Sequence, residues 1–288
     1  MLILLKMKKI RKISIIHSIS RKYQSALKAC IDSAEREGIY ISSVNSIKSE
    51  NLLNEISKEE IDLILVIGGD GTMIGAIENL LICKTPFLGI NIGKLGFLTD
   101  INVESISFEL PKIFKGEFVE EQRPLLEVTT SKNFKKAAVN EIVFHSGKIA
   151  QMMSFSIFQG QNLISKHKSD GVIVSSATGS TGYLFSGGGP IIHPTLSVFA
   201  ILPMFSQSAS SNPMVLPSSE KIIIKLEKKN QATIAVDGHV DPDISESSHI
   251  EISQKELSYT LLHPINYDYF EACRTKLSWG LPLVNIHE

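Results

Sequence analysis

Apolar and polar positions along the first hundred residues indicate strands separated by helices. Short apolar runs, typical of strands buried on both faces, alternate with amphipathic segments typical of helices that cover a sheet. The expected strands and helices, in chain order, lie at 12–18 (strand), 21–37 (helix), 39–44 (strand), near 50–56 (helix), 61–67 (strand), after 72 (helix) and 86–92 (strand). This alternation predicts a mainly parallel, Rossmann-like sheet.

The pattern changes after about residue 100. A helical stretch at 103–118 leads into short β-rich runs and into period-two alternation, as at 153–157. Helix signals then stay sparse until 267–280. We therefore expect an α/β N-terminal domain at 1–100, an all-β, sandwich-like C-terminal domain at 101–265, and a segment at 266–288 that returns to the first domain.

Composition narrows the possible partners. The 288 residues are 43% hydrophobic and 20% charged, with a formal net charge of −1. This composition is that of a globular protein, and the charge lacks the basic surplus that attraction to nucleic acid or anionic lipid needs, so we expect a small-molecule partner. The apolar run at the N-terminus is too short to span a bilayer and lacks the features of a secretory signal. We expect a cytoplasmic protein.

The loop Gly68-Gly69-Asp70-Gly71-Thr72 follows a buried-looking strand and opens an amphipathic helix. Its glycines let the backbone approach an anion and adopt positive φ, and the start of the helix directs N–H groups and a positive dipole end at the same point. Gly68, Gly69, Gly71 and Thr72 thus form a candidate phosphate loop. A carboxylate there would repel phosphate unless it binds a cation or accepts a proton from a nucleophile, which suggests that Asp70 serves phosphoryl transfer.

A second glycine-containing loop, at 93–98, follows the next expected strand. Ligands in open α/β sheets bind outside the carboxyl ends of the strands. We therefore expect the two loops to line one crevice.

Residues 168–190 concentrate hydroxyls and glycines around one aromatic residue, Tyr183, directly after an expected strand. Hydroxyls at 175–181 offer donors and acceptors, and the tyrosine offers a flat face for a purine or ribose. This composition suits a nucleotide, although a surface loop rich in serine and glycine would look the same.

Other candidate residues are ambiguous on their own. Asn140 and Glu141 could bond to a sugar diol or form a solvated turn, and Asp170-Gly171 and Asp237-Gly238 are ordinary turn pairs. The histidines lack the spacing of a metal site and are better read as solvent-facing or core residues; they include His145, His193, His239 and His263.

Six stretches together resemble the NAD kinase family, and specifically its bacterial members. They are GGDGT at 68–72, NIGKLGFLTD at 91–100, NEIVFHSGKIAQM at 140–152, KSDGVIVSSATGSTGYLFSGGGPIIHP at 168–194, PMFSQSASSNPMVLP at 203–217 and FEACRTKLSWG at 270–280. The GGDG loop is shared with diacylglycerol and sphingosine kinases. The stretches TGSTGY and NIGKLGFL are more specific to NAD kinases.

The resemblance implies the two-domain NAD kinase fold and ATP-dependent phosphorylation of the 2'-hydroxyl on the adenosine ribose of NAD. It also implies a divalent cation such as Mg²⁺ and a homodimer or homotetramer. By matching motif, Asp70 would be the catalytic general base, and no metal ligands are assigned. The NAD-binding positions that the resemblance implies are Asp70, Gly71, Asn140, Glu141, Gln151, Lys168, Asp170, Thr181, Gly182, Tyr183, Leu184, Phe185, Ser186 and His239.

The chain departs from the family pattern at three places. It reads SATGSTGY at 176–183 where TPTGSTAY is common, which puts Gly182 in place of alanine. Gln207 replaces a histidine, and Asn212 stands where an arginine is frequent. These changes bear on affinity and donor preference more than on the reaction. Two alternatives remain open: a GGDG-type kinase acting on a lipid or other alcohol, and a non-catalytic NAD(P)-binding regulator.

Overall fold

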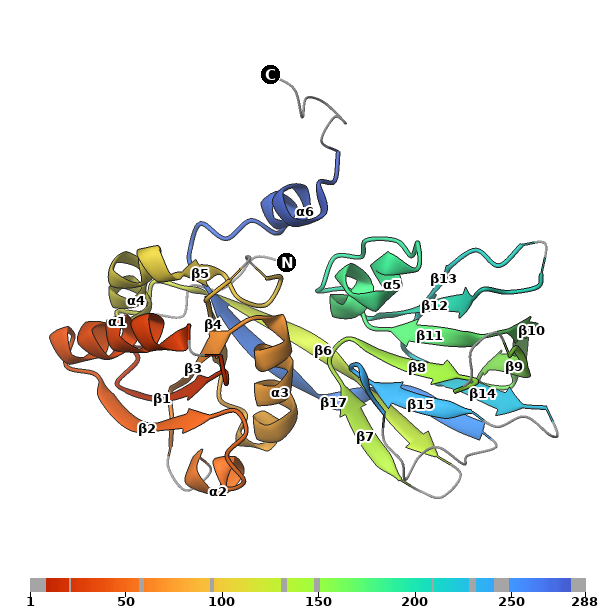
Figure 1. Ribbon diagram of the computed structural model, residues 1–288, viewed down its shortest axis with the longest axis horizontal. Helices are drawn as coiled ribbons and strands as arrows, with labels where there is room; N and C mark the ends of the chain where they lie inside the picture. Colours follow the sequence, from red (N-terminus) through yellow and green to blue (C-terminus); the bar gives the residue numbers. More distant parts are fainter. Residues whose placement is uncertain are drawn as a thin grey trace. The chain divides into compact units, whose positions relative to one another are not determined.

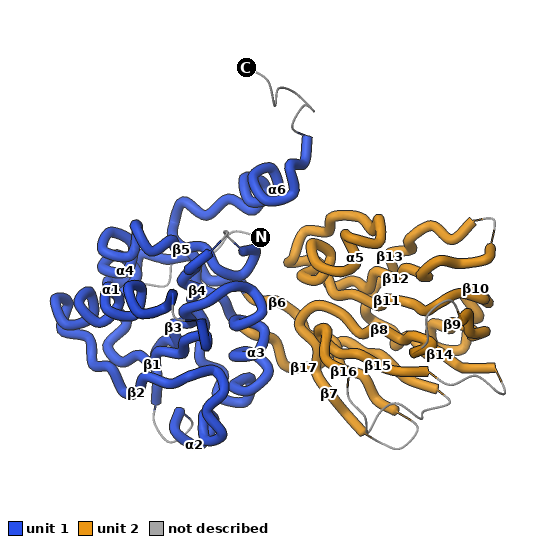
Figure 2. Tube along the Cα trace, in the orientation of Figure 1, with its two compact units in different colours: residues 1–121, 260–288 blue, residues 122–259 orange. Residues whose placement is uncertain are grey.

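The computed structural model of the chain describes residues 9–20, 22–56, 60–93, 96–130, 134–147, 151–208, 210–227, 232–240 and 249–280. It divides into two compact units (Figure 2): unit 1, residues 1–121 and 260–288, and unit 2, residues 122–259. The chain passes from unit 1 to unit 2 within strand β6 (Val119–Thr130) and returns within β17 (His249–His263).

Unit 1 is built on a parallel sheet in the order β4-β3-β1-β2. Strand β5 pairs with β4, and so does the end of β17, through Leu261 and Phe87. The strands are β1 (Lys12–His17), β2 (Tyr40–Ser46), β3 (Leu63–Gly68), β4 (Phe87–Asn91) and β5 (Ile101–Asn102). The helices are α1 (Tyr23–Arg36), α2 (Leu52–Ile56), α3 (Asp70–Leu80), α4 (Ile106–Phe114) and α6 (Tyr269–Leu277), with the 3₁₀ turns η1 (Leu81–Cys83) and η2 (Val103–Ser105).

Helices lie on both faces of this sheet, which explains why its central strands β3 and β4 are buried throughout and mostly apolar. Every residue of β3 and β4 is buried. Ile13 and Ile15 of β1 share a core with Cys30 of α1 and Leu110 of α4. Helix α3 packs on the other side of the strands (Figure 1).

Unit 2 is a sandwich of two antiparallel layers. One layer is a six-stranded sheet in the order β13-β12-β11-β8-β15-β16, and the other contains β10-β9-β14-β17 with β6 and β7. The strands are β7 (Lys135–Ala138), β8 (Glu141–His145), β9 (Met153–Gln159), β10 (Asn162–Ser169), β11 (Gly171–Ser175), β12 (Val198–Met204), β13 (Met214–Pro217), β14 (Ile222–Leu226), β15 (Thr233–Val236) and β16 (His239–Val240). Two short helical turns, η3 (Thr178–Thr181) and α5 (Tyr183–Ser186), follow β11.

The core of unit 2 lies between these layers, and strand alternation determines which residues enter it. Ile142 and Phe144 of β8 face Phe155 of β9 and Ile224 of β14 within one buried cluster. The opposite face of the six-stranded sheet is covered in part by a second cluster that includes Leu184. Among the described residues, the rest of that face borders a cavity.

The expected fold class is confirmed: an α/β unit with a parallel sheet and a second, all-β unit. The units divide the chain at other positions than the expected domain limits of 1–100 and 101–265. Residues 101–121 belong to unit 1, because the apolar side of α4 packs against α1 and the parallel sheet. Within the described residues, the helices are too short or too polar to cross a bilayer.

Candidate active site

The loop of residues 68–72 ends β3 and begins α3. A Cβ atom at Gly68 would lie 2.4 Å from Thr72 Oγ1, so the first turn of the helix can fold back on the strand only above a glycine. Gly69 and Gly71 are surrounded by open space, since a Cβ there would meet nothing within 4 Å. The expectation that these glycines supply positive φ is wrong. Their contribution is the absence of side-chain bulk.

The first turn of α3 offers backbone donors to an anion. The N–H groups of Thr72 and Met73 bond to the carbonyl of Gly69 at 2.9 and 3.1 Å. The N–H groups of Asp70 and Gly71 come too early in the helix for an intrahelical partner and lie at the positive end of its dipole. Because Gly69 and Gly71 are exposed, a phosphate group can reach these donors.

The carboxylate of Asp70 joins this loop to the second glycine-containing loop. Asp70 Oδ2 accepts from the Phe97 N–H at 2.7 Å, and Oδ1 accepts from the Leu98 N–H at 3.0 Å. The Thr99 hydroxyl lies 3.5 Å from Oδ1. A Cβ on Gly96 would fall 1.9 Å from the same oxygen, so residue 96 has to be glycine. The two loops therefore meet at one acidic side chain, a contact that the sequence did not predict.

These bonds fix the orientation of the Asp70 side chain without occupying all of its hydrogen-bond acceptor positions. A carboxylate offers about four lone-pair positions, and the bonds to the second loop occupy two or three of them. The side chain is only partly buried. It can therefore accept a further hydrogen bond from a substrate hydroxyl.

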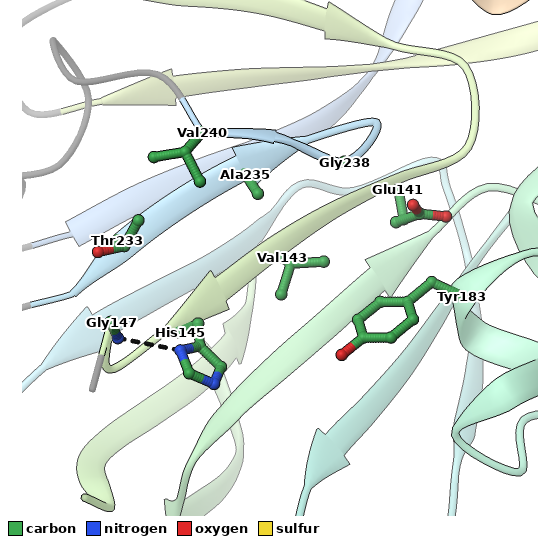
Figure 3. A pocket seen from close by; sticks show the side chains of 9 residues that line it. All are labelled: Glu141, Val143, His145, Gly147, Tyr183, Thr233, Ala235, Gly238 and Val240. Atoms are coloured by element: carbon green, nitrogen blue, oxygen red, sulfur yellow. Dashed lines mark hydrogen bonds between the residues drawn. The ribbon is translucent and has the colours of Figure 1, made fainter. Parts of the chain in front are cut away.

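The uncovered face of the six-stranded sheet in unit 2 carries a cavity of 630 Å³ (Figure 3). Alternate residues of β8 reach it, because Ile142 and Phe144 point into the core and their neighbours point the other way. The residues that line the cavity are Glu141, Val143, His145, Gly147, Tyr183, Thr233, Ala235, Gly238 and Val240. Most of the wall is apolar, with a few polar groups at its two ends, as in many ligand sites.

Glu141 supplies a buried carboxyl group at one end of the cavity. Only 6% of the residue is exposed, and its Oε2 has no hydrogen-bond partner among the described residues. Burial, and then the nearby charge of Asp237, raise the pKa of Glu141 to about 7, against a smaller opposing effect of the Tyr183 backbone N–H. Near neutral pH this group can therefore either donate or accept a hydrogen bond.

Asp237 holds the backbone at the start of β8. Its carboxylate accepts the N–H groups of residues 139–141 at 2.6, 2.7 and 3.0 Å. Asp237 and Gly238 both have positive φ, 46° and 79°, and form the two-residue turn between β15 and β16. The turn was predicted from the sequence, but this anchoring role was not.

Comparison with known proteins places the chain in a family. Residues 12–118 match the ATP-NAD kinase N-terminal domain, and residues 139–263 match the ATP-NAD kinase C-terminal domain. The chain is 40% identical over 228 residues to an NAD kinase of Pseudoalteromonas translucida, covering 77% of this chain and 78% of that protein. It is 38% identical over 225 residues to an NAD kinase of Chromohalobacter salexigens, covering 76% and 77%. The chain belongs to the NAD kinase family.

Solved structures agree with this assignment. A crystal structure of an NAD kinase from Archaeoglobus fulgidus in complex with ATP superposes with a TM-score of 0.77 at 27% identity, covering 93% of this chain and 98% of that one. Yeast NADH kinase complexed with NADH superposes with a TM-score of 0.81 at 19% identity, covering 98% and 91%, and supports the fold alone.

Some of the residues expected to bind NAD lie together in unit 2. Glu141 and Tyr183 line the cavity. A Cβ on Gly182 would lie 3.5 Å from both Asn140 Nδ2 and Glu141 Oε2. An alanine at 182, common in the family pattern, would therefore make van der Waals contact with both polar groups. His239 lies between two lining residues of β16 and its turn without lining the cavity itself.

Several hydroxyls of the segment after β11 are not available to a nucleotide. The Ser175 hydroxyl donates to the carbonyl of Asn140 and the Ser176 hydroxyl to that of Val139, and Ser180 bonds to the backbone of Ile192. All three serines are buried. Their expected role as ligand donors is wrong, because Ser175 and Ser176 hold the segment against the start of β8 and Ser180 ties it to Ile192.

The remaining predicted residues lie elsewhere in unit 2. Leu184 is fully buried in the cluster behind the cavity, so its side chain faces no solvent. Asp170 is linked through its carbonyl to the Ser146 N–H at 3.0 Å, beside the His145 end of the cavity. The other residues lie at least partly on the surface and do not line the cavity: Gln151, Lys168, Thr181, Phe185 and Ser186.

Sequence reasoning missed most of the cavity wall. Val143 and His145 could have been found from the period-two pattern that begins at Glu141, and Thr233 and Ala235 from the same pattern at 232–236. Which face of each strand points outward depends on the sandwich packing, which no local pattern reveals.

The buried carboxyl of Glu141 leads to a prediction about stability. The pKa of Glu141 is raised from 4.5 in the unfolded chain to about 7, so the folded state binds the proton more tightly and this group's contribution falls as the pH rises from 4.5 to 7. We expect Glu141→Gln, which resembles the protonated acid, to be more stable than the parent at pH 8 by on the order of 3 kcal/mol. The difference should vanish below pH 4.5.

Urea unfolding at pH 4.5 and pH 8 measures this difference. Glu256→Gln, on an exposed part of β17, is the matched control and should shift stability little at either pH. Equal stability of Glu141→Gln and the parent at pH 8 would show that the carboxylate is solvated in the folded protein.

Proposed function

We propose that this chain transfers the terminal phosphate of ATP to the 2'-hydroxyl on the adenosine ribose of NAD, giving NADP and ADP. The observation that carries the proposal is Asp70, a carboxylate at the N-terminus of α3 with both oxygens oriented by the backbone of residues 97 and 98. An acidic group at an anion-binding helix start is what a reaction between a phosphate and a hydroxyl requires.

The proposed reaction is a direct transfer of the γ-phosphoryl group from ATP to the ribose. The ribose 2'-oxygen bonds to the γ-phosphorus as the bond from that phosphorus to the bridging oxygen of ADP breaks. The hydroxyl proton goes to Asp70. Because the transition state of phosphoryl transfer is loose, positioning and charge neutralisation matter more than a strong base. The N–H groups at the start of α3 can stabilise phosphate oxygens during the transfer.

In unit 2 we assign NAD contacts to the cavity and its border. Asn140 and Glu141 offer donors and acceptors to ribose hydroxyls, and Tyr183, 46% exposed, offers its ring to the nucleoside. Gly182 leaves room beside both polar groups. The expected contributions of Gln151, Lys168, Asp170 and His239, and of the rest of residues 181–186, rest on the family resemblance.

A divalent cation is part of the proposal. Among the described residues, no group of three His, Cys, Asp or Glu side chains is arranged to hold a metal. Mg²⁺ in such enzymes is usually held by one or two carboxylates together with substrate phosphates, and we assign no carboxylate of this chain to it, because Asp70 serves as the base. The cation would neutralise phosphate charge. Magnesium as the metal, the cytoplasm as the compartment and a homo-oligomer as the assembly also rest on the resemblance.

The test is an assay of the purified protein for NADP formed from NAD with ATP and Mg²⁺. A kinase acting on a lipid alcohol would leave NAD unchanged, and a non-catalytic regulator would bind NAD without consuming ATP. Either result would refute the proposal.

We expect Tyr183→Ala to raise the KM for NAD about tenfold while the thermal stability changes little. The ring is half exposed on the cavity wall, so its loss removes contact with the nucleoside rather than core packing. Steady-state kinetics and a melting curve measure both quantities. A variant that unfolds, or one with an unchanged KM, would remove Tyr183 from the substrate site.

A further inference from the structure

Two polar side chains stand at the end of the cavity opposite Glu141, and the proposed reaction does not use them. His145 of β8 and Thr233 of β15 are direct cross-strand partners, and both line the cavity. Paired residues of this kind have Cβ atoms about 5 Å apart. Along β8, His145 comes four positions after Glu141, about 13 Å at the usual rise per residue.

The hydrogen bonding of His145 determines which of its ring nitrogens carries the proton. The Gly147 backbone N–H donates to His145 Nδ1 at 2.9 Å (Figure 3). A backbone amide can only donate, so Nδ1 is the acceptor and the neutral ring carries its proton on Nε2. No described residue bonds to Nε2. His145 therefore offers an N–H donor to a ligand.

Gly147 stabilises the end of the cavity formed by His145 and Thr233, which we call the corner. Its φ is +73°, and a Cβ there would lie 2.6 Å from Thr233 Oγ1. Only glycine can therefore form the turn that donates to His145 while the Thr233 hydroxyl stays close. The corner presents an N–H donor and a hydroxyl that can accept.

We propose that His145 and Thr233 recognise the carboxamide of the nicotinamide ring, an inference that rests on the proposed function. His145 Nε2–H donates to the amide carbonyl, and Thr233 Oγ1 accepts from the amide NH₂. Val143, Ala235 and the other apolar wall residues flank the planar ring. The adenosine ribose lies toward Glu141 and Tyr183.

Adenine also presents an acceptor, its ring N1, next to a donor, its amino group. The donor and acceptor of the corner could therefore bind either base. We favour nicotinamide because the aromatic ring offered to the adenosine nucleoside, that of Tyr183, lies at the other end of the cavity. Two dinucleotide analogues distinguish the bases. The 3-acetylpyridine analogue of NAD lacks the amide NH₂ but keeps the carbonyl, and the hypoxanthine analogue replaces the adenine amino group.

The experiment measures kcat/KM for NAD and both analogues in the parent, in Thr233→Val and in His145→Phe. We expect the parent to prefer NAD over the acetylpyridine analogue about fivefold, the value of one neutral hydrogen bond. Thr233→Val should abolish that preference by weakening NAD alone, through KM. His145→Phe should weaken NAD and the acetylpyridine analogue equally, since both keep the carbonyl.

Thr129→Val, the same change at a partly exposed position of β6 outside the cavity, is the matched control and should preserve the parent's preference. The proposal is overturned if Thr233→Val keeps that preference, or if it instead abolishes the preference for NAD over the hypoxanthine analogue, which would place adenine in the corner.

A binding measurement separates this proposal from the proposed function. If the parent makes no NADP, the function fails, but titration calorimetry with nicotinamide mononucleotide still tests the corner. We expect the parent to bind it about fivefold more tightly than Thr233→Val does. Equal affinities, or a ¹⁵N spectrum showing His145 protonated on Nδ1, would refute the assignment.

Discussion

Replacing Asp70 with asparagine should lower kcat for NADP formation by about 100-fold or more, because general-base assistance typically contributes 10² to 10⁴ in rate. Asparagine keeps the size of the side chain but cannot take the 2'-hydroxyl proton. The KM for NAD should change much less, since the contacts assigned to NAD in unit 2 are unaffected. Steady-state kinetics of NADP formation measure both constants.

The structure shows why this substitution needs a control. The carboxylate accepts from the N–H groups of both Phe97 and Leu98. An asparagine can accept only through its one oxygen, so its amide would face one of these N–H groups donor to donor. We expect a loss of stability of about 1–2 kcal/mol in addition to the catalytic effect.

Thr99→Val supplies that control. It removes the Thr99 hydroxyl, which lies 3.5 Å from Asp70 Oδ1 and accepts a hydrogen bond from the Asn91 side chain at 2.8 Å. The negative charge of Asp70 stays in place. It should therefore loosen the same loop with only a small fall in kcat. If Thr99→Val loses as much activity as Asp70→Asn, Asp70 supports the loop and is not the base. Turnover of Asp70→Asn within tenfold of the parent would have the same meaning.

Local sequence patterns were sufficient to predict an element where its residues depend mainly on their neighbours along the chain. The apolar run at 61–67 predicted a buried strand, and the segment after it predicted a helix, which the structure contains. The aspartate-glycine pair at 237–238 predicted a turn, and it forms the turn between β15 and β16, whereas the same pair at 170–171 leads directly into β11. These elements are determined by residues close together in the sequence, so a local pattern is enough to predict them.

Long-range partners could not be predicted in this way. Gly71 and Gly96 both lie in glycine-containing loops, yet only Gly96 is required by the contact of another residue, Asp70, 26 positions away. Similarly, Ser176 looked like a ligand donor because hydroxyls suit nucleotides, but it bonds to the carbonyl of Val139. The difference lies in which strand packs alongside, and that is set by the tertiary fold.

His263 is the clearest case of a long-range partner. The sequence allowed either a solvent-facing or a core histidine. In unit 1 it is fully buried, with Nδ1 2.5 Å from Asp100 Oδ2 and Nε2 3.0 Å from Glu121 Oε2, and its ring stacks on Tyr267 at 4.0 Å. Ionised carboxylates only accept hydrogen bonds, so we predict that both ring nitrogens donate and that the ring carries a positive charge. It joins the end of β17 to β6 and to the residue that follows Thr99.

We therefore expect His263→Phe to lower the free energy of unfolding by about 3–5 kcal/mol, because two largely buried carboxylates lose the cation they share. In a protein of this size that corresponds to a fall in Tm on the order of 10 °C. Thermal and urea unfolding measure the loss. The exposed His239, changed to phenylalanine, is the matched control and should leave Tm nearly unchanged.

Removing the charges together should restore much of what the single change loses. In a variant with His263→Phe, Asp100→Asn and Glu121→Gln, no buried carboxylate remains at this cluster, and replacing a whole buried ion pair is often close to neutral. We expect the triple variant to be more stable than His263→Phe alone. If it is less stable, or if His263→Phe melts within 2 °C of the parent, the histidine acts through its ring packing on Tyr267 and the charge of the cluster contributes little to the stability of unit 1.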